Sequence, residues 1–308
     1  MKRMNYLKIA TGAIFMALSF NMEARESVSV KRKSVVAAEK TNARDCDPGL
    51  VQIDMDINNV RTKLLNTGDM WWDRNSAKYQ VPKISKAQLA NGEKGPNSLF
   101  SGAIWVSGKD QGGNLKIAAI TFSGSESEYW PGPLVSGNLE AINKKTCKDW
   151  DQFFNVFGKD IDKVVGLYKK NGAVAESEVP DGVKYWPGRK NDFLSRDKGL
   201  DVEEAMAPFF DRDNDGIYDP TKGEFPAIKR GEEAYADQMV FWVLNDYGNN
   251  HTATQGQPLG IQMNCLAFAF ASSNELNDMT FYRYHIVNKS SSDVTQTYMS
   301  QFVDCDLG

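Results

Sequence analysis

The stretch Gln238-Met239-Val240-Phe241-Trp242-Val243-Leu244-Asn245 decides the fold, because an unbroken apolar run stands between two polar residues. We interpret it as a β-strand. Successive side chains of a strand point to opposite faces of the sheet, so both faces of this strand are apolar. We therefore expect other parts of the chain to cover it on both sides.

The residues that follow this strand predict a β-meander. Apolar runs at 260–271, 279–288 and 294–303 alternate with polar turns centred near Glu275 and Ser291. Strands in a meander pair in chain order, which would place Cys265 opposite His285. The polar loop 246–258 before them is a candidate binding surface.

Further strands are expected in the first half of the chain. Residues 101–108 and 115–122 surround the Gly-rich turn 109–114, a pattern typical of a hairpin. Residues 79–82 indicate an edge strand that ends at its proline.

One amphipathic helix is predicted between these strands and the central one. Apolar residues recur at helical spacing from Trp150 to Tyr168, Thr146 with Asp149 could cap the start, and Asn171-Gly172 could close the end. A helix lying across a sheet is favoured over a partner-binding helix. The fold class is thus mainly β, an antiparallel β-sandwich-like body with one amphipathic helix and a calcium-binding loop.

The N-terminus predicts an export signal. Basic residues precede a short apolar core, which indicates a signal peptide over 1–24, followed by a polar, flexible leader over 25–45. The β-rich domain would span 46–308 and could divide into two subdomains near 175–205. The chain stops directly after a strand, so we expect it to be the N-terminal part of a longer protein.

Composition limits the classes of function. The net charge of −4 is well mixed, which argues against a nucleic-acid partner, and no later segment predicts a transmembrane helix. With only two histidines, a zinc cluster or a His-based catalytic centre is not expected. Export would make the four cysteines candidates for disulfides, and three pairings are open. In the expected meander Cys305 lies too far from Cys265 for a simple disulfide between them. Cys305 could instead pair with Cys46 or Cys147, or with residues further along.

The loop at 211–220 predicts a structural calcium site. Acidic residues at alternate positions, then a Gly and a further Asp, supply the oxygens that Ca²⁺ prefers. Lys222 stands where a helix-loop-helix calcium site has its bidentate Glu, so the pattern is closer to the Asp-rich loops of extracellular modules. The alternative is a solvated acidic turn. The candidate ligands are Asp211, Asp213, Asp215, the carbonyl of Ile217, Asp219 and Glu224.

Four tryptophans are candidates for a glycan-binding surface: Trp71, Trp72, Trp130 and Trp186. An exposed indole can stack on a sugar, although a buried Trp in a β-core is the commoner state. Trp71 and Trp72 are adjacent, so one is expected in the core and the other at a rim.

Several motifs together resemble a family of large exported proteins that leave the cell by the type IX secretion system. The resemblance rests on Gly68-Asp69-Met70-Trp71-Trp72-Asp73 and Tyr129-Trp130-Pro131-Gly132-Pro133-Leu134, and on residues 58–61, 98–105, 211–220, 241–246 and 304–308. It implies an N-terminal β-rich region, further modules, a C-terminal sorting domain and the secretion machinery as a partner. It supplies no catalytic residues.

These observations favour a secreted or cell-surface, calcium-stabilised structural or adhesion module without enzymatic activity. The alternative is an extracellular glycan-binding or glycan-cleaving protein that uses the tryptophans and a carboxylate pair. A serine or cysteine hydrolase is weaker, because no Gly-x-Ser-x-Gly elbow occurs.

Overall fold

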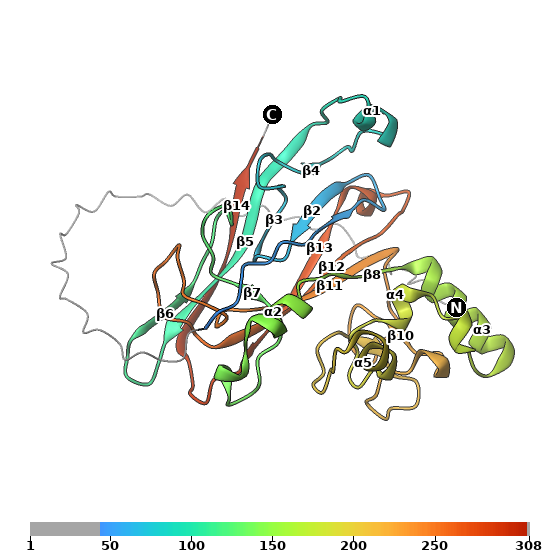
Figure 1. Ribbon diagram of the computed structural model, residues 1–308. Coiled ribbons are helices and arrows are strands. Elements are labelled where there is room, and N and C mark those ends of the chain that lie inside the picture. The colour runs from blue at the N-terminus through green and yellow to red at the C-terminus, as the bar shows by residue number, and fades with distance from the viewer. Residues whose placement is uncertain (1–43, 307–308) are drawn as a thin grey trace, which may run out of the picture. The chain divides into compact units, whose positions relative to one another are not determined.

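Two antiparallel β-sheets pack face to face in the computed structural model, which describes residues 44–306 (Figure 1). The predicted signal peptide and nearly all of the predicted leader lie outside the described residues. Strands of the first sheet run in the order β1-β2-β3-β5-β14, with β4 and β6 also pairing β5, and those of the second run β13-β12-β11-β7, with β8 pairing β11. The predicted mainly β, sandwich-like body is confirmed.

The first sheet consists of β1 (Gln52–Met55), β2 (Arg61–Leu65), β3 (Asp69–Met70), β4 (Tyr79–Gln80), β5 (Asn97–Lys109), β6 (Leu115–Ala118) and β14 (Thr295–Cys305). The second consists of β7 (Trp130–Pro131), β8 (Phe154–Phe157), β11 (Gln238–Asn245), β12 (Ile261–Ala269) and β13 (Phe281–Asn288). A small separate ribbon pairs β9 (Phe209–Phe210) with β10 (Phe225–Pro226). The α-helices are α1 (Lys86–Ala90), α2 (Lys144–Asp149), α3 (Gly158–Asn171), α4 (Asp181–Lys184) and α5 (Asp192–Lys198). Short 3₁₀ turns are η1 (Leu139–Ala141), η2 (Glu176–Glu178), η3 (Pro220–Lys222) and η4 (Glu275–Asp278).

Strand β11 is buried along its whole length, as the sequence predicts. Val240, Trp242 and Leu244 enter the core between the two sheets. Met239, Phe241 and Val243 enter a second core on the opposite face. That second core is closed by α3 and by the chain from Val174 to Phe225, which covers the outer face of the second sheet (Figure 1).

The predicted boundary near 175–205 falls inside this covering segment. Apolar side chains from it pack into the same second core as β11: Val179, Val183, Trp186, Leu194, Leu200 and Val202. Residues 44–306 belong to one compact unit.

The predicted helix is wrong in its first half. Residues Phe154–Phe157 form strand β8 and pair with β11, and α3 begins only at Gly158. Because bulky aromatic side chains can alternate across a strand as well as line a helix, the open edge of β11 decides between the two states. Thr146 lies inside the separate helix α2, whose N-cap is Asn143. Gly172, with a φ of 75°, closes α3 as expected.

The predicted meander holds for β12 and β13 but is wrong for β14. The register is shifted by one residue from the expectation, so His285 pairs with Asn264 and Cys265 pairs with Tyr284. After β13 the chain crosses to the first sheet, where β14 pairs with β5. The rings of Phe302 and Trp105 stack there at 5.3 Å, which stabilises this pairing.

The hairpin of β5 and β6 is confirmed, although β6 ends at Ala118. Strand β4 is not an edge strand, because it pairs with both β2 and β5. Its successor Pro82 lies beyond the strand and therefore leaves the hydrogen-bond ladder intact.

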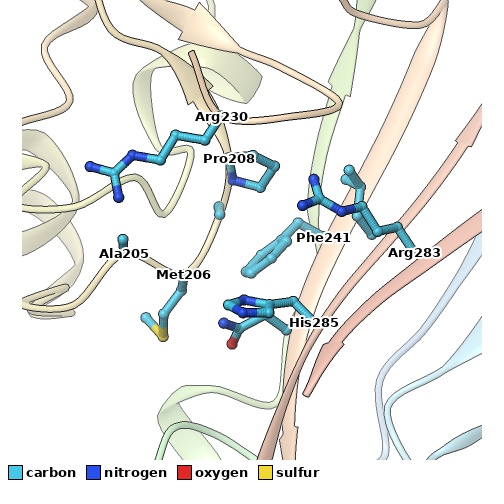
Figure 2. Close-up of a pocket in the computed structure, with 10 residues that line it drawn as sticks. Ala205, Met206, Pro208, Arg230, Phe241, Arg283 and His285 are labelled. Atoms are coloured by element: carbon cyan, nitrogen blue, oxygen red, sulfur yellow. The ribbon is translucent and has the colours of Figure 1, made fainter. Parts of the chain in front are cut away.

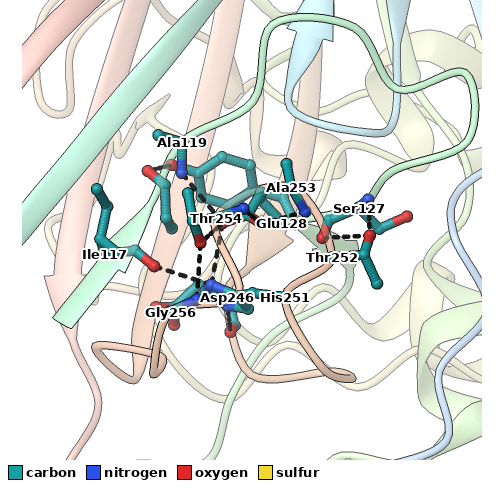
Figure 3. Close-up of polar contacts among 12 residues, drawn as sticks. Ile117, Ala119, Ser127, Glu128, Asp246, His251, Thr252, Ala253, Thr254 and Gly256 are labelled. Carbon is teal, nitrogen blue, oxygen red and sulfur yellow. Dashed lines mark hydrogen bonds and ion pairs between the residues drawn. The ribbon is translucent and has the colours of Figure 1, made fainter. Parts of the chain in front are cut away.

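A buried polar network joins the β6 end of the first sheet to the loop between β11 and β12 (Figure 3). Glu128 is completely buried and accepts hydrogen bonds from the backbone N–H groups of Ala119, Ala253 and Thr254. The ring nitrogens of His251 lie 2.8 Å from the carbonyl of Ile117 and 2.7 Å from that of Asp246. His251 and Asp246 of the loop thus turn inward, whereas residues 250, 252, 255 and 257 are exposed, so the loop as a binding surface stays a prediction.

Cys46 and Cys147 form a disulfide. It lies in a third apolar cluster with Trp130, Leu134 and Ile142 and fixes the start of the described chain to α2. Among the described residues Cys265 is free and buried, and Cys305 is free and exposed. No helix within residues 44–306 has the length and apolar character needed to cross a bilayer.

Candidate metal centre

The acidic loop lies between the two strands of the small ribbon. Phe210 of β9 pairs with Phe225 of β10, and their rings stack at 5.0 Å. The guanidinium of Arg212 lies 4.3 Å from the ring centre of Tyr168 on α3 and donates to the carbonyl of Gly223. Both ends of the loop are thus held against the second core.

Four carboxylates converge inside this loop. Oxygen atoms of Asp211, Asp213, Asp215 and Glu224 all lie within 4.8 Å of one another. Gly216 adopts a φ of 74°, and its N–H donates to Oδ2 of Asp211 at 2.9 Å. The positive φ is accessible to glycine at little cost, so this residue provides the turn that the sequence predicts.

Glu224 is the buried member of the group. Its Oε1 accepts from the N–H of Arg212 at 3.1 Å, and its Oε2 accepts from the N–H of Asp219 at 2.8 Å. Burial raises the pKa of Glu224 to about 7, the negative charges of Asp211 and Asp213 act in the same direction, and the two backbone hydrogen bonds act against it. The carboxyl group is therefore poised between its acid and its anion near neutral pH.

The cation Lys222 forms ion pairs with members of this group. The Nζ of Lys222 lies 2.7 Å from Asp213 Oδ2 and 2.9 Å from Asp215 Oδ2. The hydrogen bonds to these two carboxylates raise the pKa of Lys222. Oδ1 of Asp211 is buried and has no hydrogen-bond partner among the described residues. A cation with several vacant ligand positions would satisfy this oxygen and reduce the repulsion among the four carboxylates.

Two further predicted ligands, Asp219 and the carbonyl of Ile217, stay predictions, and the backbone of both residues contacts the group. Oδ1 of Asp219 accepts hydrogen bonds from the N–H and hydroxyl of Thr221 and caps the 3₁₀ turn η3. Its position after Gly216 suits a cap as well as it suits a ligand. Ile217 contacts the group through its N–H, which donates to Oδ1 of Asp215.

The four tryptophans that could have formed a sugar-binding surface are all buried, at most 6 % exposed. Trp71 has a φ of 79°, so the chain turns there and both it and Trp72 reach the interior instead of alternating between core and rim. The indoles of Trp130 and Trp186 are enclosed by the third apolar cluster and the second core. None offers a free ring face for stacking on a sugar.

Sequence reasoning did not find the counter-ion of the site or the buried Glu128–His251 pair. Lys222 occupies the loop position at which a helix-loop-helix calcium site has its bidentate Glu. Its positive charge prevents it from binding the metal, but the sequence does not show which carboxylates it contacts. Glu128 and His251 are 123 positions apart in the numbering and share no motif, so only the fold reveals their pairing.

In comparisons with known proteins the chain matches no family model, and no curated protein and no solved structure matches it.

Proposed function

We propose that this chain is a calcium-stabilised structural or adhesion module that acts outside the cytoplasm, exported through the type IX secretion system. The convergence of Asp211, Asp213, Asp215 and Glu224 is the observation that carries the proposal. In this role the metal orders a loop on a β-sandwich, and the secretion machinery is the partner during export.

The donor set fits calcium better than a transition metal. All four side chains offer carboxylate oxygen, and the group contains no histidine or cysteine. Calcium prefers six to eight oxygen ligands, whereas zinc and copper favour nitrogen and sulfur. Asp211, Asp213, Asp215 and Glu224 would hold the ion, and its charge would replace that of the Lys222 ammonium.

The disulfide between Cys46 and Cys147 supports a location outside the cytoplasm, because disulfides persist mainly in oxidising environments. The basic head and apolar core of residues 1–24 support export. The type IX route rests on the motif resemblance alone.

Thermal unfolding with and without CaCl₂ tests the metal site. Calcium at ten times its dissociation constant should stabilise the folded chain by about 1.4 kcal/mol, which raises Tm by roughly 2–3 °C for a chain of this size. The double variant Asp213→Ala with Asp215→Ala should lose this rise. A matched double variant at exposed acids outside the loop, Glu232→Ala with Glu233→Ala, should keep it. An equal rise in the first double variant would place the ion elsewhere.

A further inference from the structure

We propose that a cavity on the outer face of the second sheet binds a small organic acid, a carboxylate attached to an apolar body. This inference is independent of the calcium site. The cavity measures about 250 Å³ (Figure 2). It is lined by Ala205, Met206, Ala207, Pro208, Arg230, Phe241, Asn264, Leu266, Arg283 and His285.

The register of the second sheet brings the lining residues together. Phe241 pairs with Leu266, which pairs with Arg283 on the next strand. In the neighbouring row Asn264 pairs with His285. Arg283 and His285 are two positions apart on β13 and so project from the same face. In Figure 2 they lie beside the Phe241 ring, with Met206 and Pro208 on the other side.

The floor of the cavity is apolar. Phe241 and Leu266 are buried members of the second core, and Met206 and Ala207 reach the cavity from the segment that crosses the sheet. An apolar ligand group placed here would be removed from water, which favours binding.

The rim is cationic. Arg230, Arg283 and His285 are exposed, and no Asp or Glu is among the lining residues. Arg230 and Arg283 supply the positive charge of the rim. Figure 2 shows the Arg230 guanidinium extending away from the Phe241 ring, which leaves Arg283 and His285 as the closer groups.

Several hydrogen-bond donors at the cavity have no acceptor among the described residues. Nη1 of Arg283 donates to the carbonyl of Ile228, which fixes the guanidinium, while its Nε and Nη2 have no partner within residues 44–306. The ring of His285 likewise makes no hydrogen bond there. Oδ1 of Asn264 accepts from Gln262, but Nδ2 of this buried side chain has no acceptor in the described part of the chain.

Fixed donors above an apolar floor define the ligand class. A guanidinium presents its N–H groups in a planar fork that matches a carboxylate. The apolar body would lie on Phe241 and Leu266 while its carboxylate accepts from Arg283, His285 and Asn264. A cavity of this size suits an acid with one ring or a short branched chain.

The probe for this site is 3-phenylpropionate, with 3-phenylpropan-1-ol as the uncharged analogue and inorganic phosphate as the anion without an apolar body. Isothermal titration of the whole chain in calcium-free buffer keeps the result separate from the metal proposal. The acid should bind at least tenfold more tightly than either comparison compound.

Arg283→Met should weaken binding of 3-phenylpropionate about tenfold or more, since a charge-assisted hydrogen bond is lost. Asn264→Asp should weaken it as well, because it places a negative charge beside the carboxylate. Lys94→Met removes an exposed cation far from β13 in the sequence and should leave binding unchanged. Circular dichroism verifies that each variant is folded, and Arg283 is exposed, so its variant should fold.

The proposal is overturned if the acid and the alcohol bind with equal affinity, or if a folded Arg283→Met variant binds the acid as tightly as the wild type. Tighter binding of phosphate than of the acid would also overturn it and would define a site for inorganic anions.

Discussion

Nδ1 of His251 lies 3.0 Å from Oε2 of Glu128, and both side chains are fully buried. Both ring nitrogens face acceptors, because Nε2 also contacts the carbonyl of Asp246. Such an environment suits an imidazolium ion that carries a proton on each nitrogen. The charged pair joins the first sheet to the loop that follows β11, and its effect on stability can be measured (Figure 3).

We predict that His251→Gln lowers the free energy of unfolding by about 3 kcal/mol at pH 6, because Glu128 would stay buried without its counter-ion. Burial alone lowers the pKa of His251, but the hydrogen bond to Glu128 and the carbonyl of Asp246 outweigh it and raise the pKa above the ordinary value of 6.5. The stabilisation is thus fully present below pH 6.5 and is lost as the pH rises through the folded-state pKa. Burial raises the pKa of Glu128, but its hydrogen bonds lower it below 4.5 overall, so the pair also weakens in strong acid.

Urea unfolding of wild type and His251→Gln from pH 5 to pH 9 measures this difference. His285→Gln, at an exposed position, serves as the control and should leave the unfolding free energy unchanged. A difference between wild type and His251→Gln that grows above pH 7 would contradict the charged pair.

We predict that Gly102→Ala destabilises the fold by about 1–3 kcal/mol through overpacking. A methyl group at this position would lie 2.4 Å from Cζ3 of Trp71, whose indole lies directly on the β5 backbone. Gly166→Ala on the exposed face of α3 is the matched control, because a methyl group there meets no atom within 4 Å. It should stabilise the protein by about 0.5–1 kcal/mol. Equal destabilisation by both changes would show that the Trp71 contact is not the cause.

We predict that Lys222→Met tightens calcium binding roughly two- to fivefold. The ammonium group contacts Asp213 and Asp215, and a metal ion must displace it from these carboxylates. Isothermal titration with CaCl₂ measures the change. Lys198→Met, an exposed lysine outside the loop, should have no effect. Weaker calcium binding by Lys222→Met would mean that the lysine supports the site.

We predict that calcium affinity falls below pH 7, approaching tenfold per pH unit, because Glu224 must lose its proton to bind the metal. Its pKa of about 7 lies above the ordinary value of 4.5, so the ionised carboxylate disfavours the metal-free fold at neutral pH. The metal-free chain should therefore gain stability as the pH falls from about 7 toward 4.5.

Glu224→Gln should abolish most of the pH dependence of calcium affinity and of the stability of the metal-free chain. It should also lower calcium affinity at pH 8. Calcium titrations at pH 6, 7 and 8 provide the test. An unchanged pH dependence in the variant would assign the titrating proton to another group.

The sequence predicts most of the strands but not how they are assembled. Apolar alternation and turns locate β5, β6, β11, β12 and β13, because these features are local. The pairing of β14 with β5 depends on a free edge of β5, and no short stretch of sequence encodes that edge. The same holds for Phe154, where the edge of β11 overrides a helical pattern.

The convergence of acidic side chains in the loop could also be predicted, because its sequence pattern is local. Asp211, Asp213 and Asp215 alternate within one turn, so their convergence follows from local geometry. Asp219 has the same chemistry and also caps η3, and only its bonds to Thr221 reveal this second role. The cavity beside Arg283 brings together three strands and a crossing segment and has no motif at all.

The pairing of β14 with β5 has a consequence for biosynthesis. Thr295 and Lys109, which are in contact at one end of this pair, are 186 positions apart. The first sheet therefore cannot acquire β14 until the 186 positions that follow Lys109 have been synthesised. Until β14 pairs there, the outer edge of β5 presents unpaired backbone groups beside Trp105, and a second copy of the chain can add a strand at this edge.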